Sequence, residues 1–303
     1  MTNDVYDVLI VGGSYAGMQA ALTLARSLRK VLVVDAGKPC NRYVQNAHNL
    51  LMHDGDKPDD IAAASKEQVL TYPGVAYKEA TIEHIERSGT KFIARDQQGE
   101  MYTARKIVLA TGVKDVLPEL PGFRECWGKS IVHCPYCHGY EVKGRKIGLL
   151  VPHTIAREFL SLLYNWSADL ILFTNGTDFT DRASQKFVVA NSIRTIPNRV
   201  TKVEHKDGNL CAVHTNDGGE YEVDALFTSV PFEQQAIVSA LGCALDEKGL
   251  VETNVVGATS IEGVYAAGDC LTSMRAISVA IASGYRAGIG INNELINEEW
   301  EDL

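Results

Sequence analysis

The residues with the clearest chemistry are Cys134 and Cys137, which enclose Pro135 and Tyr136. This C-x-x-C spacing brings two thiols onto one turn of the chain, close enough to form a disulfide or to relay electrons. The amino-terminal thiol of such a pair is often exposed and easily ionised, and the thiolate is the nucleophile in disulfide exchange. The spacing therefore predicts thiol–disulfide chemistry.

Histidines flank the cysteine pair on both sides. His138 follows Cys137 directly, and His133 precedes Cys134. An unperturbed imidazole titrates near neutrality, so either ring could take a proton from a thiol or return one to a leaving thiolate. We expect His138 to be the acid–base residue, with His133 as the alternative.

Three other interpretations of the cysteine pair compete with redox chemistry. A structural zinc ion needs four ligands, and the sequence has no second C-x-x-C and no H-x₃-H, so we expect no metal site. With His138 the pair reads C-x-x-C-H, the attachment sequence of c-type haem, although that attachment usually occurs outside the cytoplasm and no export signal precedes it. The pair could also be inert. The other cysteines are expected to be small buried hydrophobic residues, namely Cys40, Cys126, Cys211, Cys243 and Cys270.

A βαβ unit at the amino end supplies a candidate cofactor site. Asp7–Val11 predicts a strand, Met18–Leu28 has helical periodicity, and Val31–Asp35 predicts a second strand. The turn between the first strand and the helix reads Gly12-Gly13-Ser14-Tyr15-Ala16-Gly17. Strand, glycine turn, helix, strand and terminal carboxylate together indicate a dinucleotide-binding site.

Individual residues of this unit have distinct physical roles. Gly12 permits the tight turn, and Gly17 lets the helix and the strand pack closely. The amino end of the helix offers N–H groups and a partial positive charge to a pyrophosphate. Asp35 stands where a carboxylate accepts hydrogen bonds from an adenosine ribose. Ser14 replaces the middle glycine of G-x-G-x-x-G, and its hydroxyl could bond phosphate.

A second βαβ unit follows the cysteine pair in degraded form. Strands are predicted at Lys146–Val151 and Leu170–Phe173, with a helix at Thr154–Tyr164 between them. The turn Val151–Ala156 has valine and histidine where glycines would admit a pyrophosphate, and its proline lacks an N–H donor. Thr174–Asp178 offers neither an arginine for a 2′-phosphate nor a well-placed ribose carboxylate. This unit predicts a dinucleotide fold whose ligand chemistry is lost or changed.

The other elements complete a two-domain α/β chain. The prolines of Leu117–Gly122 indicate a crossing linker. The remaining predictions are a helix at Ile61–Leu70, an antiparallel meander with strands at Val75–His84 and Lys91–Ala94, a buried strand at Lys106–Gly112, a hairpin of Gly208–Asn216 and Glu220–Phe227, and a small-residue helix at Ala276–Asn293. We expect the acidic tail Glu298–Leu303 to be mobile.

Length, composition and charge exclude several classes of protein. The chain has 303 residues, enough for about two domains of ~150 residues each. Its 46% hydrophobic and 22% charged residues are ordinary for a globular protein. A net charge of −9 argues against nucleic-acid binding, and no apolar run reaches the ~18 residues of a membrane helix. We expect a cytoplasmic protein that binds neither nucleic acid nor membrane.

Taken in order, these motifs resemble the low-molecular-weight thioredoxin reductase family of FAD-dependent pyridine nucleotide-disulfide oxidoreductases. The resemblance covers nearly the whole chain and rests on Gly12–Gly17, Asp35, Ala110–Gly112, Leu117–Gly122, Cys134–Cys137 and Gly263–Asp269. It implies two Rossmann-like three-layer α/β domains and a homodimer. Residues 1–113 and 244–303 would form a discontinuous FAD-binding domain. Residues 114–243 would form an inserted, degenerate NADPH-like domain that carries the redox pair.

The resemblance implies non-covalent FAD as the cofactor. The expected cofactor-binding residues are Gly12, Gly13, Ser14, Ala16, Gly17, Asp35, Ala110, Thr111, Gly112, Gly268, Asp269 and Ala276. Of these, Gly12, Ser14 and Gly17 would hold the pyrophosphate. Asp35 would bind the adenosine ribose, and Asp269 would bond the ribityl chain.

The resemblance also implies roles at the redox pair. Cys137 would face the flavin C4a, Cys134 would attack the substrate sulfur, and His138 stands where the reductases usually carry an acid–base aspartate. The reductases' G-x-G-x-x-A turn and H-R-R-x-x-x-R phosphate clamp fall on the degraded unit and are missing here. Because each charge-assisted hydrogen bond contributes roughly 1.5–3 kcal/mol, NADPH affinity should be lower by orders of magnitude. NADPH is therefore not expected as a cofactor.

This pattern is similar to the NADPH-independent branch of the family. That branch includes the FAD-dependent dithiol oxidases of the gliotoxin and holomycin pathways, and reductase-like flavoproteins with another electron donor. We predict an FAD-dependent thiol–disulfide oxidoreductase that acts on a dithiol or disulfide small molecule or on a thioredoxin-like protein. Two alternatives stay open: an NADPH-dependent thioredoxin reductase with an atypical nucleotide site, and a non-catalytic flavoprotein that senses redox state.

Overall fold

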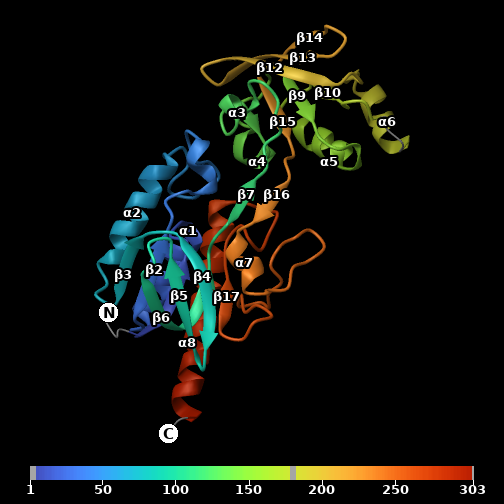
Figure 1. Ribbon diagram of the computed structural model, residues 1–303. Coiled ribbons are helices and arrows are strands. Elements are labelled where there is room, and N and C mark those ends of the chain that lie inside the picture. The colour runs from blue at the N-terminus through green and yellow to red at the C-terminus, as the bar shows by residue number, and fades with distance from the viewer. Residues whose placement is uncertain (1–4, 178–181, 302–303) are drawn as a thin grey trace. The chain divides into compact units, whose positions relative to one another are not determined.

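The computed structural model describes residues 5–177 and 182–301, which divide into two compact units (Figure 1). The first unit is made of the chain up to Arg42, Pro58–Lys114 and the chain from Phe232 onward, and the second unit is made of Tyr43–Lys57 and Asp115–Pro231. The first unit is therefore assembled from three stretches of chain and the second from two.

This division differs from the sequence-based boundaries at two places. The insertion predicted over 114–243 ends at Pro231, because Ile237 and Val238 pack in the hydrophobic core of the first unit. The segment Tyr43–Lys57, which the sequence assigns to the FAD-binding domain, belongs to the second unit.

The described residues of the first unit form a seven-stranded sheet with the order β3-β2-β1-β6-β5-β4, and β17 also pairs with β6. The parallel strands are β1 (Val5–Val11), β2 (Val31–Asp35), β3 (Val75–Glu79), β6 (Met101–Leu109) and β17 (Val264–Ala266). The antiparallel strands are β4 (Ile82–Ser88) and β5 (Lys91–Asp96). The predicted meander is therefore wrong for β3, which pairs parallel with β2 because the intervening helix α2 (Pro58–Leu70) acts as a crossover.

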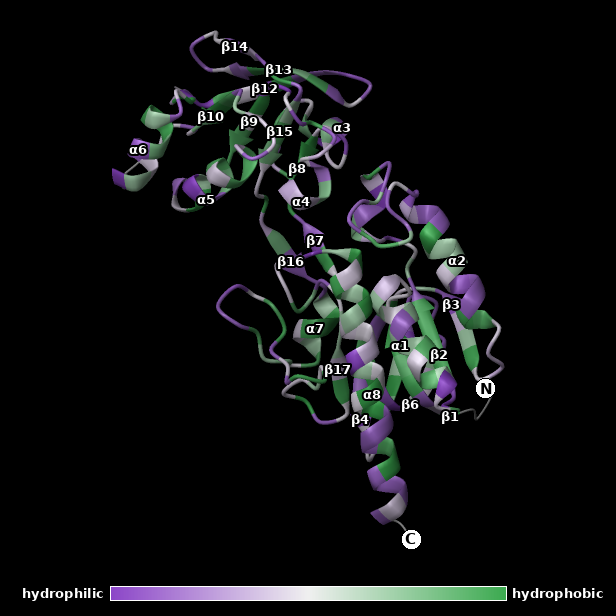
Figure 2. Ribbon diagram, turned by 180° about the vertical axis from the view of Figure 1, so that it is seen from behind, coloured by the Kyte–Doolittle hydropathy of each residue, from purple (hydrophilic) through white to green (hydrophobic). Residues whose placement is uncertain are grey.

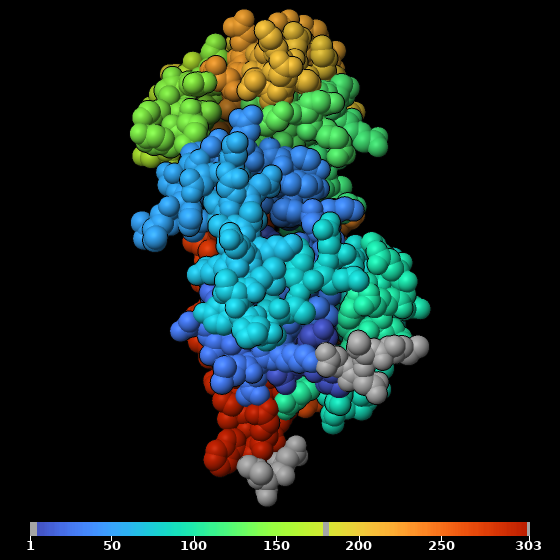
Figure 3. Space-filling model, turned by 90° about the vertical axis from the view of Figure 1, so that its left-hand side faces the viewer, coloured from blue at the N-terminus to red at the C-terminus, as the bar shows by residue number. Residues whose placement is uncertain are grey.

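Two of the helices that cover this sheet pack closely against each other. Helices α1 (Tyr15–Arg26) and α8 (Ile277–Glu301) meet through small residues, and a Cβ on Gly284 would lie 2.1 Å from the Ala16 carbonyl oxygen. The predicted small-residue helix is thus confirmed, as is the helix predicted at Ile61–Leu70. Helix α2 covers one outer face of the unit (Figure 3). The strands β1, β2 and β6 are mainly hydrophobic, whereas the far end of α8 is mainly hydrophilic (Figure 2).

Ion pairs hold the carboxyl end of α8 against β6. Lys106 Nζ lies 2.5 Å from Glu294 Oε1 and also pairs with Glu298. Arg105 pairs with Glu298 at 3.0 Å and with Glu299 at 2.8 Å. For its described residues the predicted mobile tail is therefore wrong, because cations on the neighbouring strand face its acidic side chains. Residues 302 and 303 of that tail lie outside the described residues.

The described part of the second unit contains a five-stranded parallel sheet with the order β11-β10-β9-β15-β8. Its strands are β8 (Ile131–Val132), β9 (Ile147–Leu150), β10 (Leu170–Phe173), β11 (Arg194–Ile196) and β15 (Ala225–Thr228). Its helices are α3 (Phe123–Cys126), α4 (Pro135–His138), α5 (His153–Leu163) and α6 (Arg182–Ala190). Because α5 joins β9 to β10, the second predicted βαβ unit is confirmed.

A separate three-stranded sheet lies in the second unit. It consists of β12 (Val200–Lys206), β13 (Asn209–Thr215) and β14 (Glu220–Glu222). The predicted single strand Glu220–Phe227 is therefore two strands, β14 and β15. The chain changes sheets at Asp224, whose N–H donates to the Lys146 carbonyl at 2.8 Å and whose carboxylate accepts from the Lys146 N–H at 3.0 Å.

The remaining elements are short. Strands β7 (Val113–Asp115) and β16 (Phe232–Gln234) pair with each other, and a 3₁₀ helix η1 (Cys40–Tyr43) and helix α7 (Ala236–Ala240) complete the described elements. None of the helices in the described residues combines the length and the apolar character that crossing a membrane requires.

Candidate active site

A cavity of about 650 Å³ lies in the first unit, where the parallel strands β2, β1, β6 and β17 end. The predicted cofactor residues that line it are Gly12, Ser14, Ala16, Asp35, Ala110, Thr111, Gly112, Gly268, Asp269 and Ala276. Gly13 and Gly17 do not line the cavity, because Gly13 packs against Asp35 and Gly17 packs against Gly12. Ligands of parallel α/β sheets bind at the carboxyl ends of the strands, and this cavity has that position.

The turn after β1 has two positions that only glycine can occupy. Gly12 has a φ of +106°, and a Cβ there would lie 2.3 Å from the Ala110 carbonyl oxygen. A Cβ on Gly17 would lie 1.9 Å from the Gly12 carbonyl oxygen and would push α1 away from β1. Ser14 is the N-cap of α1, and its hydroxyl makes no capping hydrogen bond. The start of α1 therefore offers unbonded N–H groups and a hydroxyl to the cavity, which suits a phosphate.

Asp35 closes one end of the cavity. Its carboxylate accepts hydrogen bonds from the Gly13 N–H at 2.9 Å and from the Tyr77 hydroxyl at 3.1 Å. Burial and this carboxylate raise the pKa of Tyr77 well above its usual range, so the hydroxyl remains a donor. A carboxylate has about four acceptor positions, so Asp35 keeps acceptor capacity for a ribose hydroxyl.

Thr111 supplies an independent sign of a ligand. Its Oγ1 is buried in the wall of this cavity and has no hydrogen-bond partner among the described residues. Since buried hydroxyls are nearly always hydrogen-bonded, this oxygen fits the polar group of a bound molecule. The strand order places Asp35 at the end of β2, the glycine turn after β1, Thr111 after β6 and Asp269 after β17. These residues fit a dinucleotide such as FAD, with Asp35 at its ribose and the glycine turn at its pyrophosphate.

Several polar residues of the cavity were missed by the sequence reasoning. They are Lys38, Asn41, Gln235 and Arg275. Arg275 Nε lies 3.4 Å from Asp269 Oδ2, so a cation lies beside the carboxylate predicted for the ribityl chain. The only signal in the sequence was adjacency, since Arg275 precedes Ala276.

The five cysteines outside the disulfide follow the burial prediction only in part. Cys126, Cys243 and Cys270 are buried, whereas Cys40 is half-buried and Cys211 is exposed. Burial raises the pKa of Cys270 to about 12, which keeps that thiol protonated. The Cys40 thiol lines the cavity and donates to the Val113 carbonyl at 2.7 Å.

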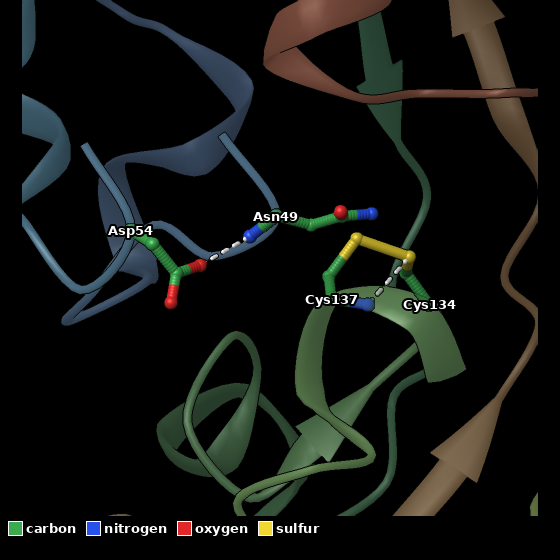
Figure 4. The surroundings of a disulfide bond; sticks show 4 residues. All are labelled: Asn49, Asp54, Cys134 and Cys137. Carbon is green, nitrogen blue, oxygen red and sulfur yellow. Dashed lines mark hydrogen bonds between the residues drawn. A yellow bond between two sulfur atoms is a disulfide. The ribbon is translucent and has the colours of Figure 1, made fainter. Parts of the chain in front are cut away.

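The predicted redox pair forms a disulfide in the second unit. Cys134 and Cys137 are bonded, with their Cα atoms 5.3 Å apart. Cys134 is the N-cap of α4, and its Sγ accepts a hydrogen bond from the Cys137 N–H at 3.2 Å (Figure 4). A donor aimed at sulfur stabilises negative charge, so Cys134 is suited to carry a thiolate. Tyr136 between them is exposed. The described residues contain no group of His, Cys, Asp and Glu placed to hold a metal ion.

The histidines beside the disulfide differ in their surroundings. Burial, and then the nearby His133 and His48 rings, lower the pKa of His138 to about 4. This differs from the near-neutral titration that the sequence predicts, because the sequence does not show the burial. A neutral ring at physiological pH can accept a thiol proton. His133 stacks on Trp127, with ring centroids 5.8 Å apart.

Within the second unit, the loop Tyr43–Lys57 contributes a third histidine, His48, to the surroundings of His138. His48 Nε2 lies 3.6 Å from Oε1 of Glu141, which follows α4. The sequence reasoning treated this loop as a connection, since no local pattern links it to the cysteine pair. The disulfide unit therefore contains imidazoles from two distant segments of the chain.

The second βαβ turn differs from the first in the residues that would face a pyrophosphate. Val151 is buried, and Pro152 is the N-cap of α5 and has no N–H to donate. After β10, Thr174 is buried, and the Asn175 side-chain oxygen accepts from the Val200 N–H at 2.9 Å. The polar groups at this strand end are therefore used within the fold.

Comparisons with known proteins agree with this architecture. A family model described as pyridine nucleotide-disulphide oxidoreductase matches residues 6–156 and 167–284. The chain is similar to thioredoxin reductase aclD of Aspergillus oryzae, with 32% identity over 99% of each chain. It is also similar to thioredoxin reductase sirT of Leptosphaeria maculans, with 29% identity over 97% of this chain and 96% of that one.

Solved structures of related proteins have the same fold. The structure of HlmI matches with a TM-score of 0.93 and 30% identity, over 100% of this chain and 96% of that one. An oxidoreductase from Agrobacterium tumefaciens matches with a TM-score of 0.91 and 32% identity, over 97% of this chain and 99% of that one. The thioredoxin reductase-like, two-unit α/β fold predicted from the motifs is confirmed.

Proposed function

This chain belongs to the pyridine nucleotide-disulphide oxidoreductase family and is a flavin-dependent oxidoreductase, and we propose that it oxidises dithiols through Cys134 and Cys137 without using NADPH. The observation that carries the proposal is the turn into α5. There, Val151 is buried and Pro152 lacks an N–H, whereas the corresponding turn of the first unit lines a cavity that fits a dinucleotide. Similarity to HlmI and to several proteins named thioredoxin reductase supports the disulfide chemistry.

The proposed exchange moves two electrons onto the cysteines. A substrate thiolate attacks Cys134 Sγ, forming a substrate–Cys134 disulfide and releasing Cys137 as a thiolate. His138, neutral at physiological pH, accepts the proton of the attacking thiol. The second substrate thiolate then attacks the sulfur bound to Cys134. This step releases the oxidised substrate and leaves a Cys134 thiolate, which the Cys137 N–H stabilises.

The cofactor supplies the electron acceptor for the reduced pair. The cavity residues would hold FAD, which when bound would supply a two-electron acceptor for the reduced cysteine pair, and we propose dioxygen as the terminal oxidant. Run in the opposite direction, with another electron donor, the same groups would reduce a disulfide in a small molecule or in a thioredoxin-like protein. We further propose that the enzyme works as a homodimer in the cytoplasm, which light scattering and cell fractionation would test.

An anaerobic titration of the purified yellow protein separates the candidate functions. We expect dithiothreitol to bleach the flavin absorbance and NADPH to bleach it slowly or not at all. Bleaching by NADPH as fast as by the dithiol would instead assign an NADPH-dependent reductase. A flavin that neither reagent bleaches would assign a non-catalytic redox sensor. The matched control is Cys134→Ser, whose flavin should resist the dithiol because the disulfide is gone.

A further inference from the structure

The redox helix α4 is a single turn that cannot hold its own shape. It spans Pro135–His138, and the Gly139 N–H closes it by donating to the Pro135 carbonyl at 2.7 Å. A first helical turn fixes several backbone angles for one hydrogen bond, so its formation alone is unfavourable. While the Cys134–Cys137 bond exists, that bond holds the turn together. Once the bond is reduced, the turn depends on packing against the rest of the second unit.

Trp166 packs against this turn through two contacts. A Cβ on Gly139 would lie 2.7 Å from Trp166 Cδ2, so the indole ring lies directly on the glycine backbone. The Tyr136 ring meets the indole edge-on, with ring centroids 6.0 Å apart and an interplanar angle of 87°. This T-shaped arrangement is a favoured geometry of aromatic pairs. Tyr136 and Gly139 lie on either side of Cys137 in the chain, so Trp166 contacts the chain before and after that cysteine.

The backbone of Trp166 is itself fixed on both sides. Its N–H donates at 2.9 Å to the carbonyl of Leu163, the last residue of α5, and its carbonyl accepts from the Gly144 N–H at 2.9 Å. Helix α5 packs in a hydrophobic core of the second unit, where Leu160 and Leu163 are fully buried. The half-buried indole is therefore carried by a well-anchored part of the chain.

We propose that Trp166 is a positioning residue for thiol–disulfide exchange: packed against Tyr136 and Gly139, it keeps α4 folded while the disulfide is open. The two reduced cysteines then stay close together, so they gain less conformational entropy on opening, and closure of the disulfide is favoured. The reduction potential of the pair is therefore lower with the indole than without it. This inference rests on the proposed function, because there the disulfide must close again after each substrate is oxidised.

Trp166 makes and breaks no covalent bond. In reduction by dithiothreitol, the reagent closes to its cyclic disulfide and the Cys134–Cys137 bond opens to two thiols. Two electrons and two protons pass from the reagent to the pair. Closure passes the same two electrons to an oxidant, which is the flavin in the proposed function, and the two thiol protons leave the pair. Trp166 changes the position of this equilibrium, because its contacts matter most in the open state.

The test measures the equilibrium of the cysteine pair in redox buffers. Holoenzyme is equilibrated without oxygen in stepped mixtures of reduced and oxidised dithiothreitol or glutathione, quenched with acid and alkylated with N-ethylmaleimide. Mass spectrometry of the peptide that contains both cysteines gives the reduced fraction at each step, and the midpoint gives the reduction potential. A residue that only stabilised the fold would stabilise the oxidised and reduced forms equally and would leave the midpoint unchanged.

We expect Trp166→Ala to shift the equilibrium about tenfold toward the reduced pair, which for a two-electron couple raises the midpoint by about 30 mV. Trp166→Phe keeps an aromatic face and should recover most of this shift. Tyr136 is exposed, so Tyr136→Ala should fold normally; it removes one of the two contacts and should shift the midpoint in the same direction by a smaller amount. Tyr136→Phe keeps the ring and should match wild type.

Tyr164, two residues before Trp166, is the matched control. Its ring meets the Phe187 ring edge-on, with centroids 6.1 Å apart and an interplanar angle of 81°. Tyr164 is the C-cap of α5 and Phe187 lies in α6, so this contact does not involve α4. Tyr164→Ala therefore loses the same kind of contact in the same unit and should keep the wild-type midpoint.

A wild-type midpoint in both Trp166→Ala and Tyr136→Ala, an equal shift in Tyr164→Ala, or no recovery in Trp166→Phe would overturn the inference. If Trp166→Ala does not fold, the comparison of Tyr136→Ala with Tyr136→Phe decides. If the pair equilibrates with the buffers in every variant but a dithiol does not bleach the flavin, the proposed function fails, and the comparison of midpoints is unaffected.

Discussion

The two βαβ turns have the same topology and offer different chemistry. In the first, Gly12 adopts a φ of +106° and Gly17 lets α1 approach β1 closely. In the second, Val151 stands at the position of Gly12, Pro152 is the N-cap of α5, and Ala156 stands at the position of Gly17. The second strand of each unit nevertheless has four consecutive buried apolar residues, Val31–Val34 in β2 and Leu170–Phe173 in β10. The fold is thus preserved by the strand residues, whereas nucleotide binding depends on a few residues of the turn.

The two units therefore carry different parts of the proposed chemistry. The first unit has the cavity that fits a dinucleotide, and the second has the disulfide. The second unit carries the redox pair, and its βαβ turn has Val151 and Ala156 where the first turn has Gly12 and Gly17. Variants at equivalent positions of the two units therefore test whether the two βαβ turns differ in function.

The largest expected effect comes from removing either redox cysteine. Cys134→Ser and Cys137→Ser should each lower dithiol oxidation on the order of a thousandfold or more, since the disulfide no longer forms. FAD content should not change, because the cavity lies in the other unit. Cys134→Ser leaves the Cys137 thiolate, for which the family resemblance implies a broad long-wavelength charge-transfer band. Cys137→Ser should instead trap mixed disulfides.

Cys211 is the control for the cysteine variants, since it is exposed and unpaired. Cys211→Ser should turn over at the wild-type rate. Measurable dithiol oxidation by both Cys134→Ser and Cys137→Ser would remove the second unit from the chemistry altogether.

Next in size is the effect of His138, where the expected rate loss in His138→Asn is about 10²–10⁴. Stability gives a second readout with a definite sign. The unfolded chain binds this proton near the ordinary imidazole pKa of ~6.5, whereas the native pKa is about 4. Native stability therefore falls as the pH drops from about 6.5 toward 4. Thermal unfolding of His138→Asn should lose less stability over that range than wild type.

His133→Asn separates the two candidate histidines. It should retain turnover above pH 6 if His138 is the base. Full activity of His138→Asn together with an inactive His133→Asn would transfer the role to His133.

Gly17→Ala tests the first turn directly. The added methyl group would overlap the Gly12 carbonyl, with its Cβ at 1.9 Å from that oxygen, so the turn must shift. Overpacking of this kind costs about 1–3 kcal/mol or more, and we expect FAD affinity to fall on the order of a hundredfold. The reverse change at the equivalent position, Ala156→Gly, should leave the flavin content of the purified protein unchanged. Equal loss of flavin in both variants would mean that the two turns do not differ in their effect on FAD binding.

Much of this fold could be predicted because its signals are local. The strand Leu170–Phe173 was predicted with the bounds that the structure has, since four apolar residues in a row fill a buried parallel strand. The glycine turn and Asp35 were predicted because a pyrophosphate requires small residues and a helix start at that spacing. Ten of the twelve expected cofactor residues line the cavity, and the other two support the turn behind it.

The parts that could not be predicted depend on contacts between distant segments. The loop Tyr43–Lys57 belongs with the disulfide through contacts such as His48 with Glu141, which no local pattern shows. Likewise, the low pKa of His138 comes from burial and from a ring on that loop. The acidic end of α8 was mistaken for a mobile tail because Arg105 and Lys106, its partners, lie far earlier in the sequence.

The smallest effect is expected at the ends of the second strands, where Asp35 is the last residue of β2 and Thr174 follows β10. Asp35→Ala removes the acceptor of the Gly13 N–H and of the Tyr77 hydroxyl, and it removes the carboxylate that fits a ribose. Because hydrogen bonds to a charged group contribute about 1.5–3 kcal/mol, FAD should bind roughly tenfold to a hundredfold more weakly.

A second variant separates the effect of the Asp35 side-chain shape from the effect of its charge. Asp35→Asn retains an oxygen acceptor without the charge, so its FAD affinity, measured by fluorescence titration of the apoprotein, should lie between those of wild type and Asp35→Ala. Thr174→Ala, at the equivalent strand end, should bind FAD as wild type does, since its Oγ1 lies in a unit without the glycine turn. If Thr174→Ala weakened FAD as much as Asp35→Ala, the cofactor would not be confined to the first turn. The contrast between the two turns would then be one of degree.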